Sequence, residues 1–331
     1  MPRADSPEEL AREIVRGEAR AIGRALTWIE AGDPRAAALS ALLPDHHVTF
    51  RLGLTGAPGV GKSSLVAALI DELRRQGERV AVLAVDPTSP ISGGALLGDR
   101  VRMARHAEDP LVFIRSLASR TGVGGIAAST DEAADLLARA GFPIVLIETV
   151  GVGQLEMEIV EEADEVWLLL SPESGDAMQL LKGGVAEKVD RLVLNKSDRP
   201  GADRLQQLAE EMAHDRGGLV PMATSCETGE GIAELAELLR KRAADSLSAP
   251  DRERQVRRIR RRIRRRAERV WIAAGFARAG GEEQLERLAG EVDRGETDLA
   301  AAVLQLTGPR STGPMTGEWA AEPPCPKEND G

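Results

Sequence analysis

A glycine-rich octapeptide between two apolar segments constrains this chain more than any other feature. Residues 56–63 read Gly-Ala-Pro-Gly-Val-Gly-Lys-Ser, with an apolar run at 48–54 before them and a helical pattern to about residue 75 after them. A strand, a Gly-x-x-x-x-Gly-Lys-Ser loop and a helix are typical of a phosphate-binding loop. Its glycines let the backbone wrap a phosphate, and the N–H groups at the helix start face the anion. The sequence therefore predicts a nucleotide site at Gly56, Ala57, Pro58, Gly59, Val60, Gly61, Lys62, Ser63 and Ser64.

Strands and helices alternate from residue 48 onward. Apolar runs predict strands at 48–54, 79–85, 111–117, 143–148, 165–170, 191–194 and 219–223. Helical patterns fall near 62–75, 99–107, 129–140, 154–163, 176–187, 201–213 and 229–242. This alternation predicts an α/β fold with a mainly parallel, doubly wound sheet. Because ligands of such sheets bind at the carboxyl ends of the strands, functional side chains are expected just after them.

Four oxygen-bearing side chains are candidates for a Mg²⁺ site. The Ser63 hydroxyl belongs to the phosphate-binding loop, Asp86 ends the second strand, and Glu148 ends the fourth. Asp99 lies in the glycine-rich segment 89–100, which suits a loop that orders on a γ-phosphate. Hydroxyl and carboxylate oxygens are ligands that Mg²⁺ prefers.

The candidate catalytic groups come from the same region. Lys62 would neutralise charge on the β- and γ-phosphates, and the backbone N–H of Gly151 would bind the γ-phosphate. Asp99, Glu148 or a loop backbone would position the attacking water. The arginines of segment 115–125 would either neutralise charge in the transition state or lie on the surface. Because no glutamine clearly takes the water-orienting role, weak intrinsic hydrolysis that a partner stimulates is expected.

Asn195-Lys196-Ser197-Asp198 follows the sixth strand and predicts the base. The Asp198 carboxylate accepts from both N1–H and the 2-amino group of guanine, whereas adenine offers neither donor. Lys196 would flank the base and Asn195 would brace the loops. Backbone N–H groups after the last strand would bind the guanine O6, at Ser225, Cys226 and Glu227. GTP, not ATP, is the predicted nucleotide.

Charge, apolar runs and cysteine content indicate which partners and which cellular compartment to expect. The net charge of −10 gives no general case for nucleic-acid binding, which is therefore not expected. No apolar run reaches the roughly 18 residues that a membrane span requires, and no signal pattern is seen at the N-terminus. Cys226 and Cys325 form no CxxC or metal-spaced set, so a reduced, cytoplasmic setting is expected.

Three motifs carry a resemblance beyond the phosphate-binding loop. They are Val-Asp-Pro-Thr-Ser-Pro-x-Ser-Gly-Gly-Ala-Leu-Leu-Gly-Asp-Arg from residue 85, Ile-Glu-Thr-Val-Gly-Val-Gly-Gln from residue 147, and Asn-Lys-Ser-Asp from residue 195. In this order the chain closely resembles the MeaB/ArgK family, GTPases that chaperone adenosylcobalamin-dependent acyl-CoA mutases, methylmalonyl-CoA mutase above all. The likeness is densest over 53–235.

The resemblance implies a P-loop GTPase that binds GTP, GDP and Mg²⁺. It assigns phosphate and Mg²⁺ contacts to Lys62, Ser63, Asp86, Asp99 and Glu148. Segment 173–182 resembles a further switch of the family that signals nucleotide state to the mutase. The positions to test in that segment are Asp176, Gln179 and Lys182.

Four parts of the chain are expected. Residues 1–47 form an N-terminal helical extension, which begins at a Ser-Pro-Glu-Glu capping box and is broken at 32–34. Residues 48–245 form the GTPase domain, 246–307 a helical arm that makes homodimers by the resemblance, and 308–331 a disordered tail. In the arm, an arginine run at 257–266 accompanies an apolar stripe suited to helix pairing. The stripe consists of Val256, Ile259, Ile263 and Val270.

Alternative functions stay open at this point. A metallocentre-insertion GTPase of the nickel-chaperone type shares the fold, but it would need a Cys/His-rich site. A GTP-binding regulator of amino-acid transport would need no mutase. The arginine run invites a nucleic-acid hypothesis, which salt-sensitive retention on DNA would test. The sequence does not identify which acyl-CoA mutase would be served.

Overall fold

The computed structural model describes residues 6–44, 49–87, 104–106, 108–119, 125–149, 163–174, 189–215, 220–248 and, with short gaps, 256–307. The chain divides into two compact units, residues 1–266 and 267–331. The four domain bounds expected from the sequence remain predictions.

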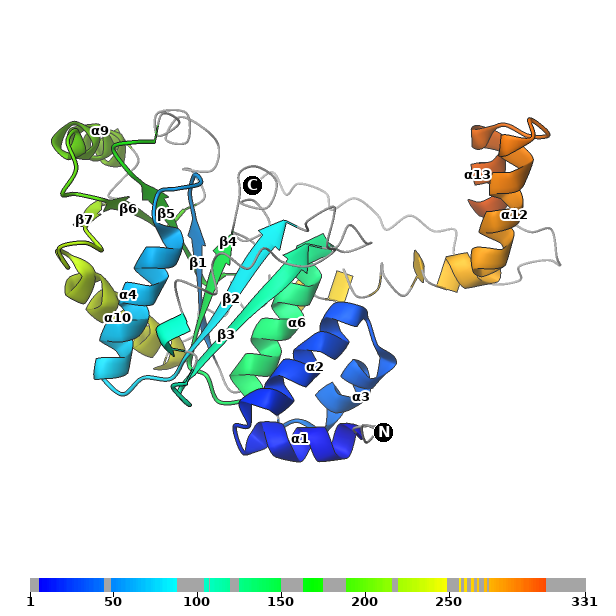
Figure 1. Ribbon diagram of the computed structural model, residues 1–331, viewed down its shortest axis with the longest axis horizontal. Helices are drawn as coiled ribbons and strands as arrows, with labels where there is room; N and C mark the ends of the chain where they lie inside the picture. Colours follow the sequence, from blue (N-terminus) through cyan, green and yellow to red (C-terminus); the bar gives the residue numbers. More distant parts are fainter. Residues whose placement is uncertain are drawn as a thin grey trace, which may run out of the picture. The chain divides into compact units, whose positions relative to one another are not determined.

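The larger unit is built on one sheet of seven parallel strands (Figure 1). They are β1 (Phe50–Thr55), β2 (Val80–Pro87), β3 (Val112–Ser119), β4 (Ile144–Thr149), β5 (Glu165–Leu170), β6 (Arg191–Asn195) and β7 (Met222–Thr224). Their order across the sheet is β3-β2-β4-β1-β5-β6-β7, and every neighbouring pair runs parallel. All seven predicted strands are confirmed, each close to its predicted bounds, and the sheet is entirely parallel rather than mainly so.

Helices cover both faces because apolar side chains alternate along the buried strands. On β2, Val80 and Val82 face one core, whereas Ala81, Leu83 and Val85 face another. The first core is closed by α4 (Lys62–Arg75) and α10 (Ile232–Ser248). On the opposite face lie α6 (Gly125–Arg139) and, over β5 and β6, α9 (Ala202–Asp215).

Three N-terminal helices extend the layer outside α6 and share its core (Figure 1). They are α1 (Pro7–Val15), α2 (Ala19–Ala31) and α3 (Pro34–Leu42). The Ser6 hydroxyl caps α1 by accepting from the Glu9 N–H at 3.2 Å. The break between α1 and α2 was not expected. The apolar spacing continues across it, but Gly17 takes a left-handed φ of 80° and ends α1.

The β1 strand, which leads into the phosphate-binding loop, is held by a buried ion pair. Arg51 on β1 donates to Asp131 on α6 at 2.6 Å, and both side chains are almost fully buried. The Arg51 N–H also donates to the Asp164 carboxylate at 2.9 Å. The strand is therefore fixed laterally before the loop begins.

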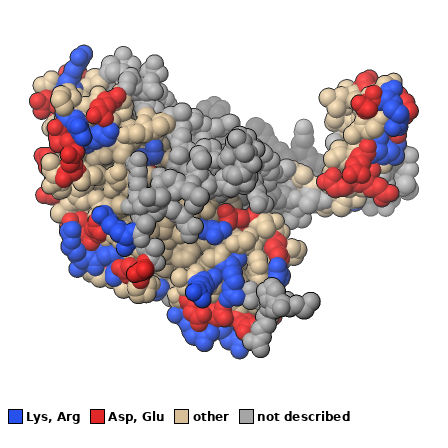
Figure 2. All heavy atoms as spheres, viewed as in Figure 1, with Lys and Arg blue, Asp and Glu red and all other residues tan. Residues whose placement is uncertain are grey.

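In the described part of the smaller unit, α12 (Gly281–Asp293) and α13 (Leu299–Thr307) contact each other. Figure 2 shows acidic and basic side chains interspersed on the visible face of the larger unit. Among the described residues, none of the helices combines the length and the apolar character of a bilayer span.

Candidate nucleotide site

The phosphate-binding loop connects β1 to α4, and two of its glycines are required by close contacts. A Cβ at Gly56 would lie 2.4 Å from the Leu169 carbonyl oxygen at the end of β5. A Cβ at Gly61 would lie 2.4 Å from the Asn195 side-chain nitrogen. Both glycines also have positive φ angles, 145° and 97°. The loop is thus packed against β5 and β6 with no room for side chains at these two positions.

Lys62 begins α4 and turns its ammonium into the loop. Nζ donates to the carbonyl oxygens of Gly56 at 2.5 Å and Ala57 at 3.1 Å, and the side chain is buried. A buried cation beside the first N–H groups of a helix makes this loop suited to a phosphate chain.

A hydroxyl and a carboxylate lie side by side at the carboxyl end of β4. The Ser63 hydroxyl donates to Glu148 Oε1 at 2.6 Å, and both residues are buried. Glu148 reaches this position because β4 pairs with β1 in a register that sets it opposite Leu54. These two oxygen ligands fit Mg²⁺. Asp86 lies at the end of β2, next to β4, but its side chain is outside the described residues, as are Asp99 and Gly151.

Asn195 links the phosphate loop to the loops that follow β6 and β7. Its Nδ2 donates to the Val60 carbonyl oxygen at 2.8 Å. Its Oδ1 accepts from the Thr224 hydroxyl at 3.3 Å and from the Cys226 thiol at 3.6 Å. Burial raises the pKa of this thiol, so Cys226 is a neutral donor near neutral pH.

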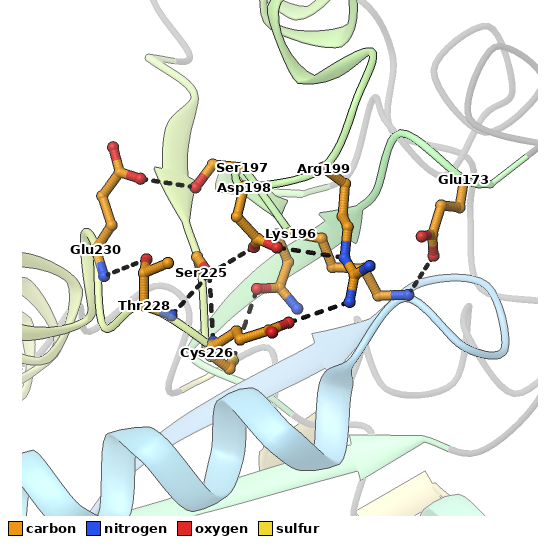
Figure 3. A network of polar contacts seen from close by, with 11 residues as sticks. Glu173, Lys196, Ser197, Asp198, Arg199, Ser225, Cys226, Thr228 and Glu230 are labelled. Atoms are coloured by element: carbon orange, nitrogen blue, oxygen red, sulfur yellow. Dashed lines mark hydrogen bonds and ion pairs between the residues drawn. The ribbon is translucent and has the colours of Figure 1, made fainter.

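Asp198 is oriented by a hydroxyl whose own direction is fixed (Figure 3). Ser225 Oγ donates to Asp198 Oδ1 at 2.5 Å while it accepts from the N–H groups of Glu227 at 3.2 Å and Thr228 at 3.1 Å. The Ser225 hydrogen bond holds the pKa of Asp198 below its ordinary value of 3.8. Asp198 is therefore ionised at neutral pH and can act only as an acceptor.

One ion pair joins this carboxylate to Arg199, and Arg199 and Lys196 each pair with a glutamate (Figure 3). Arg199 Nε lies 3.2 Å from Asp198 Oδ2, and its Nη2 donates to Glu227 Oε2 at 3.1 Å. Lys196, in the left-handed region with a φ of 62°, pairs with Glu173 at 2.7 Å. Sequence reasoning missed Arg199, and it included Glu173 only as the first residue of segment 173–182. The position of Arg199 directly after the base motif could have identified it as a site residue. Its partner Glu227 lies on another loop, so the pairing itself could not be seen in the sequence.

The remaining sequence candidates are divided between described and undescribed regions. Arg115 pairs with Glu30 and donates to Thr27 at 3.2 Å, so it joins β3 to the N-terminal helix α2 and is not directed at a phosphate. Arg120 and the switch candidates Asp176, Gln179 and Lys182 lie outside the described residues. In the described part of the chain, no group of three His, Cys, Asp or Glu side chains could hold a metal ion.

Comparison with known proteins decides the family. The model for the methylmalonyl-CoA mutase-associated GTPase MeaB matches residues 22–274. The chain belongs to the MeaB family. It is therefore a GTPase with a P-loop GTPase fold, as the sequence predicted.

Named relatives of this family member include archaeal and animal proteins. A protein of Pyrococcus horikoshii named as a GTPase is 42% identical over 243 residues, which cover 71% of this chain and 77% of the relative. The mitochondrial methylmalonic aciduria type A homolog of Mus musculus is 34% identical over 258 residues, 71% of this chain and 62% of the relative. A solved structure titled LAO/AO transport system kinase matches with a TM-score of 0.63 and 25% identity, over 92% of this chain and 98% of the other.

Proposed function

We propose that this protein is a Mg²⁺-dependent GTPase that serves as a chaperone of an adenosylcobalamin-dependent acyl-CoA mutase of the methylmalonyl-CoA mutase type. Hydrolysis of GTP to GDP and phosphate would gate the loading of the cofactor or the removal of damaged cofactor. The observation that carries this proposal is the match to the mutase-associated family over residues 22–274. The name of the mouse relative points the same way.

The phosphate side of the proposal rests on the buried loop contacts. Lys62 would bind the β- and γ-phosphates, and the start of α4 would face them. Ser63 and Glu148, whose oxygens lie 2.6 Å apart, would hold Mg²⁺ together with Asp86 and Asp99. The ion, when bound, would supply positive charge against the charge that develops on the phosphoryl oxygens. Gly151 would bind the γ-phosphate, and Asp99 or Glu148 would orient water.

The base side rests on Asp198 and its loop. An ionised carboxylate held by Ser225 suits bidentate acceptance from guanine, whereas an adenine in the same place would offer it neither of those two donors, at a cost in affinity. Lys196 would flank the base, Asn195 would hold the loops, and the 225–227 backbone would bind O6.

The mutase and dimer assignments are the further part of the proposal. Asp176, Gln179 and Lys182 would report nucleotide state to the mutase. The Lys196–Glu173 ion pair supports this, because Glu173 begins that segment and its partner belongs to the base motif. A homodimer through the helical arm is supported by apolar side chains left exposed there. Val256, Ile259 and Ile263 are exposed by 55%, 44% and 64%. A cytoplasmic location belongs to the same proposal.

A second candidate function has one observation in its favour. The solved structure with a TM-score of 0.63 is titled as a transport-system kinase, which keeps a GTP-binding regulator of amino-acid transport as the alternative. No observation on the described residues favours metallocentre insertion, since no His/Cys cluster comes together there.

The deciding experiment measures phosphate release from GTP by the purified full-length protein, alone and with each of a panel of purified acyl-CoA mutases. We expect slow hydrolysis alone and stimulation by one mutase. A pull-down with a non-hydrolysable GTP analogue should retain the same mutase, and a GDP-loaded sample is the matched control. GTP hydrolysis that no mutase changes, with no mutase retained, would contradict the chaperone role and favour the alternative.

A further inference from the structure

The carboxylate of Asp198 is contacted at both of its oxygens. Oδ1 accepts from the Ser225 hydroxyl at 2.5 Å, and Oδ2 lies 3.2 Å from Arg199 Nε. An ionised carboxylate has about four acceptor positions, two on each oxygen. Side chains from two other residues contact the carboxylate, one at each oxygen, and the backbone N–H of Asp198 contacts it as well, so several groups set its orientation.

Arg199 also reaches across to the second base loop. Its Nη2 donates to Glu227 Oε2 at 3.1 Å, so one guanidinium joins the loop after β6 to the loop after β7. Glu227 and Ser225 belong to the same turn, because the Glu227 N–H donates to Ser225 Oγ at 3.2 Å. Asp198 is thus connected to this turn twice, once through the Ser225 hydroxyl and once through Arg199 and Glu227. Figure 3 shows Ser225 and Arg199 beside Asp198.

We infer that Arg199 is a specificity-determining positioning residue, which holds the Asp198 carboxylate in the plane needed to accept two hydrogen bonds from guanine. The inference rests on the proposed role of Asp198 in base recognition. A guanidinium suits this task because its planar fork can engage two carboxylates at once, whereas a lysine ammonium is a point charge. Arg199 acts through Asp198 and is not itself required to touch the nucleotide.

The chemistry predicts which nucleotides are affected. Guanine offers N1–H and a 2-amino group, and both can donate to one carboxylate only when the carboxylate lies in the plane of the base. Inosine lacks the 2-amino group and makes one of the two bonds, so it is less sensitive to rotation of the carboxylate. Loss of Arg199 should therefore weaken the binding of GTP more than that of ITP and lower the GTP:ITP affinity ratio.

The expected size of the effect follows from exposure. The side chains of Arg199, Asp198 and Glu227 are 49%, 20% and 70% exposed. Ion pairs this exposed are partly screened by solvent, so we expect a loss of GTP affinity of about two- to fivefold. The loss should shrink as ionic strength rises.

The test measures the affinities of full-length protein for GTP, ITP and ATP by displacement of a fluorescent guanine nucleotide. Variants are Arg199→Gln, Arg199→Lys and Glu227→Gln, with Arg204→Gln as matched control, since Arg204 is an exposed arginine on α9. We expect the GTP:ITP affinity ratio to fall in all three test variants and to stay at the wild-type value in Arg204→Gln. A thermal melt of each variant confirms folding, and Glu227→Gln keeps the test available if Arg199 variants fold poorly.

Asp198→Asn separates the two levels of the proposal. If it abolishes the preference for GTP while Arg199→Gln leaves the GTP:ITP ratio unchanged, the role of Arg199 is overturned and base recognition by Asp198 stands. If Asp198→Asn keeps the full preference for GTP, base recognition by Asp198 fails, and the role of Arg199 fails with it.

Discussion

The proposed phosphate side and the proposed base side of the nucleotide site are built in different ways. The phosphate side is largely buried and comes mainly from one octapeptide. Gly56 and Gly61 leave no space there for a Cβ, and the Lys62 ammonium donates to two loop carbonyl oxygens. The base side consists of partly exposed charged side chains from loops far apart in the sequence. Buried contacts fix geometry strongly, whereas exposed ion pairs contribute little each. We therefore expect phosphate-side changes to abolish activity and base-side changes to adjust specificity.

The largest effect is expected from Lys62→Ala. The variant removes the buried cation of the phosphate side, and GTP hydrolysis should fall by a factor of about 10²–10³, as when one preorganised charge-stabilising group is lost. Phosphate release under single-turnover conditions measures it. Lys241→Ala, at an exposed lysine of α10, is the matched control and should hydrolyse GTP at the wild-type rate. A loss of GTP hydrolysis of less than tenfold in Lys62→Ala would contradict the expectation that changes on the phosphate side abolish activity.

Asn195→Ala tests the connection between the two sides. The variant leaves the buried Val60 carbonyl oxygen without the donor that lies 2.8 Å away, at a cost of about 1–3 kcal/mol in the free energy of unfolding. Because Asn195 holds the phosphate loop beside the base loops, GTP affinity should fall as well. Urea unfolding and nucleotide titration measure the two quantities. Lower stability with unchanged GTP affinity would show that the two sides act independently.

Glu173→Gln is expected to have the smallest effect. It removes the charge that pairs with Lys196 at 2.7 Å, in a side chain that is 54% exposed. GTP affinity should change by less than about fivefold at low salt and return to the wild-type value near 1 M salt. The Lys196 hydrogen bond lowers the pKa of Glu173 below its ordinary 4.5. The folded-state pKa is depressed, so the pair is present at neutral pH and is lost only as pH falls through that lower pKa. A large, salt-independent loss would instead place Glu173 with the buried side.

Local sequence was enough to predict the sheet and to single out the loop that is proposed to bind phosphate. The apolar runs and the Gly-x-x-x-x-Gly-Lys-Ser motif depend on neighbouring residues, and the strands lie close to their predicted bounds. Local sequence did not predict where α1 ends. The helical apolar spacing continues past Gly17, whereas Gly17 adopts a left-handed conformation that ends the helix. The base side was predicted only as a motif. The sequence assigned backbone N–H groups to 225–227, whereas the Ser225 hydroxyl and the Glu227 carboxylate also orient Asp198 and Arg199.

Long-range partners explain the other differences. The sequence left open whether Arg115 neutralises phosphate charge or lies on the surface. In the structure it pairs with Glu30 of the N-terminal helices, 85 residues away. Glu173 and Lys196 are 23 residues apart, and Arg199 and Glu227 are 28 apart. Such pairs depend on strand order, because the ends of β5, β6 and β7 become neighbours only in the folded sheet.

The central claim is that Asp198 selects guanine, and exchange of its acceptor for a donor tests it most directly. Xanthine carries an oxygen where guanine carries the 2-amino group, so an asparagine amide at this position can donate to it. Calorimetric titration of wild type and Asp198→Asn with GTP and XTP should show GTP preferred by the wild type and XTP by the variant. An unchanged preference for GTP in Asp198→Asn would contradict the account.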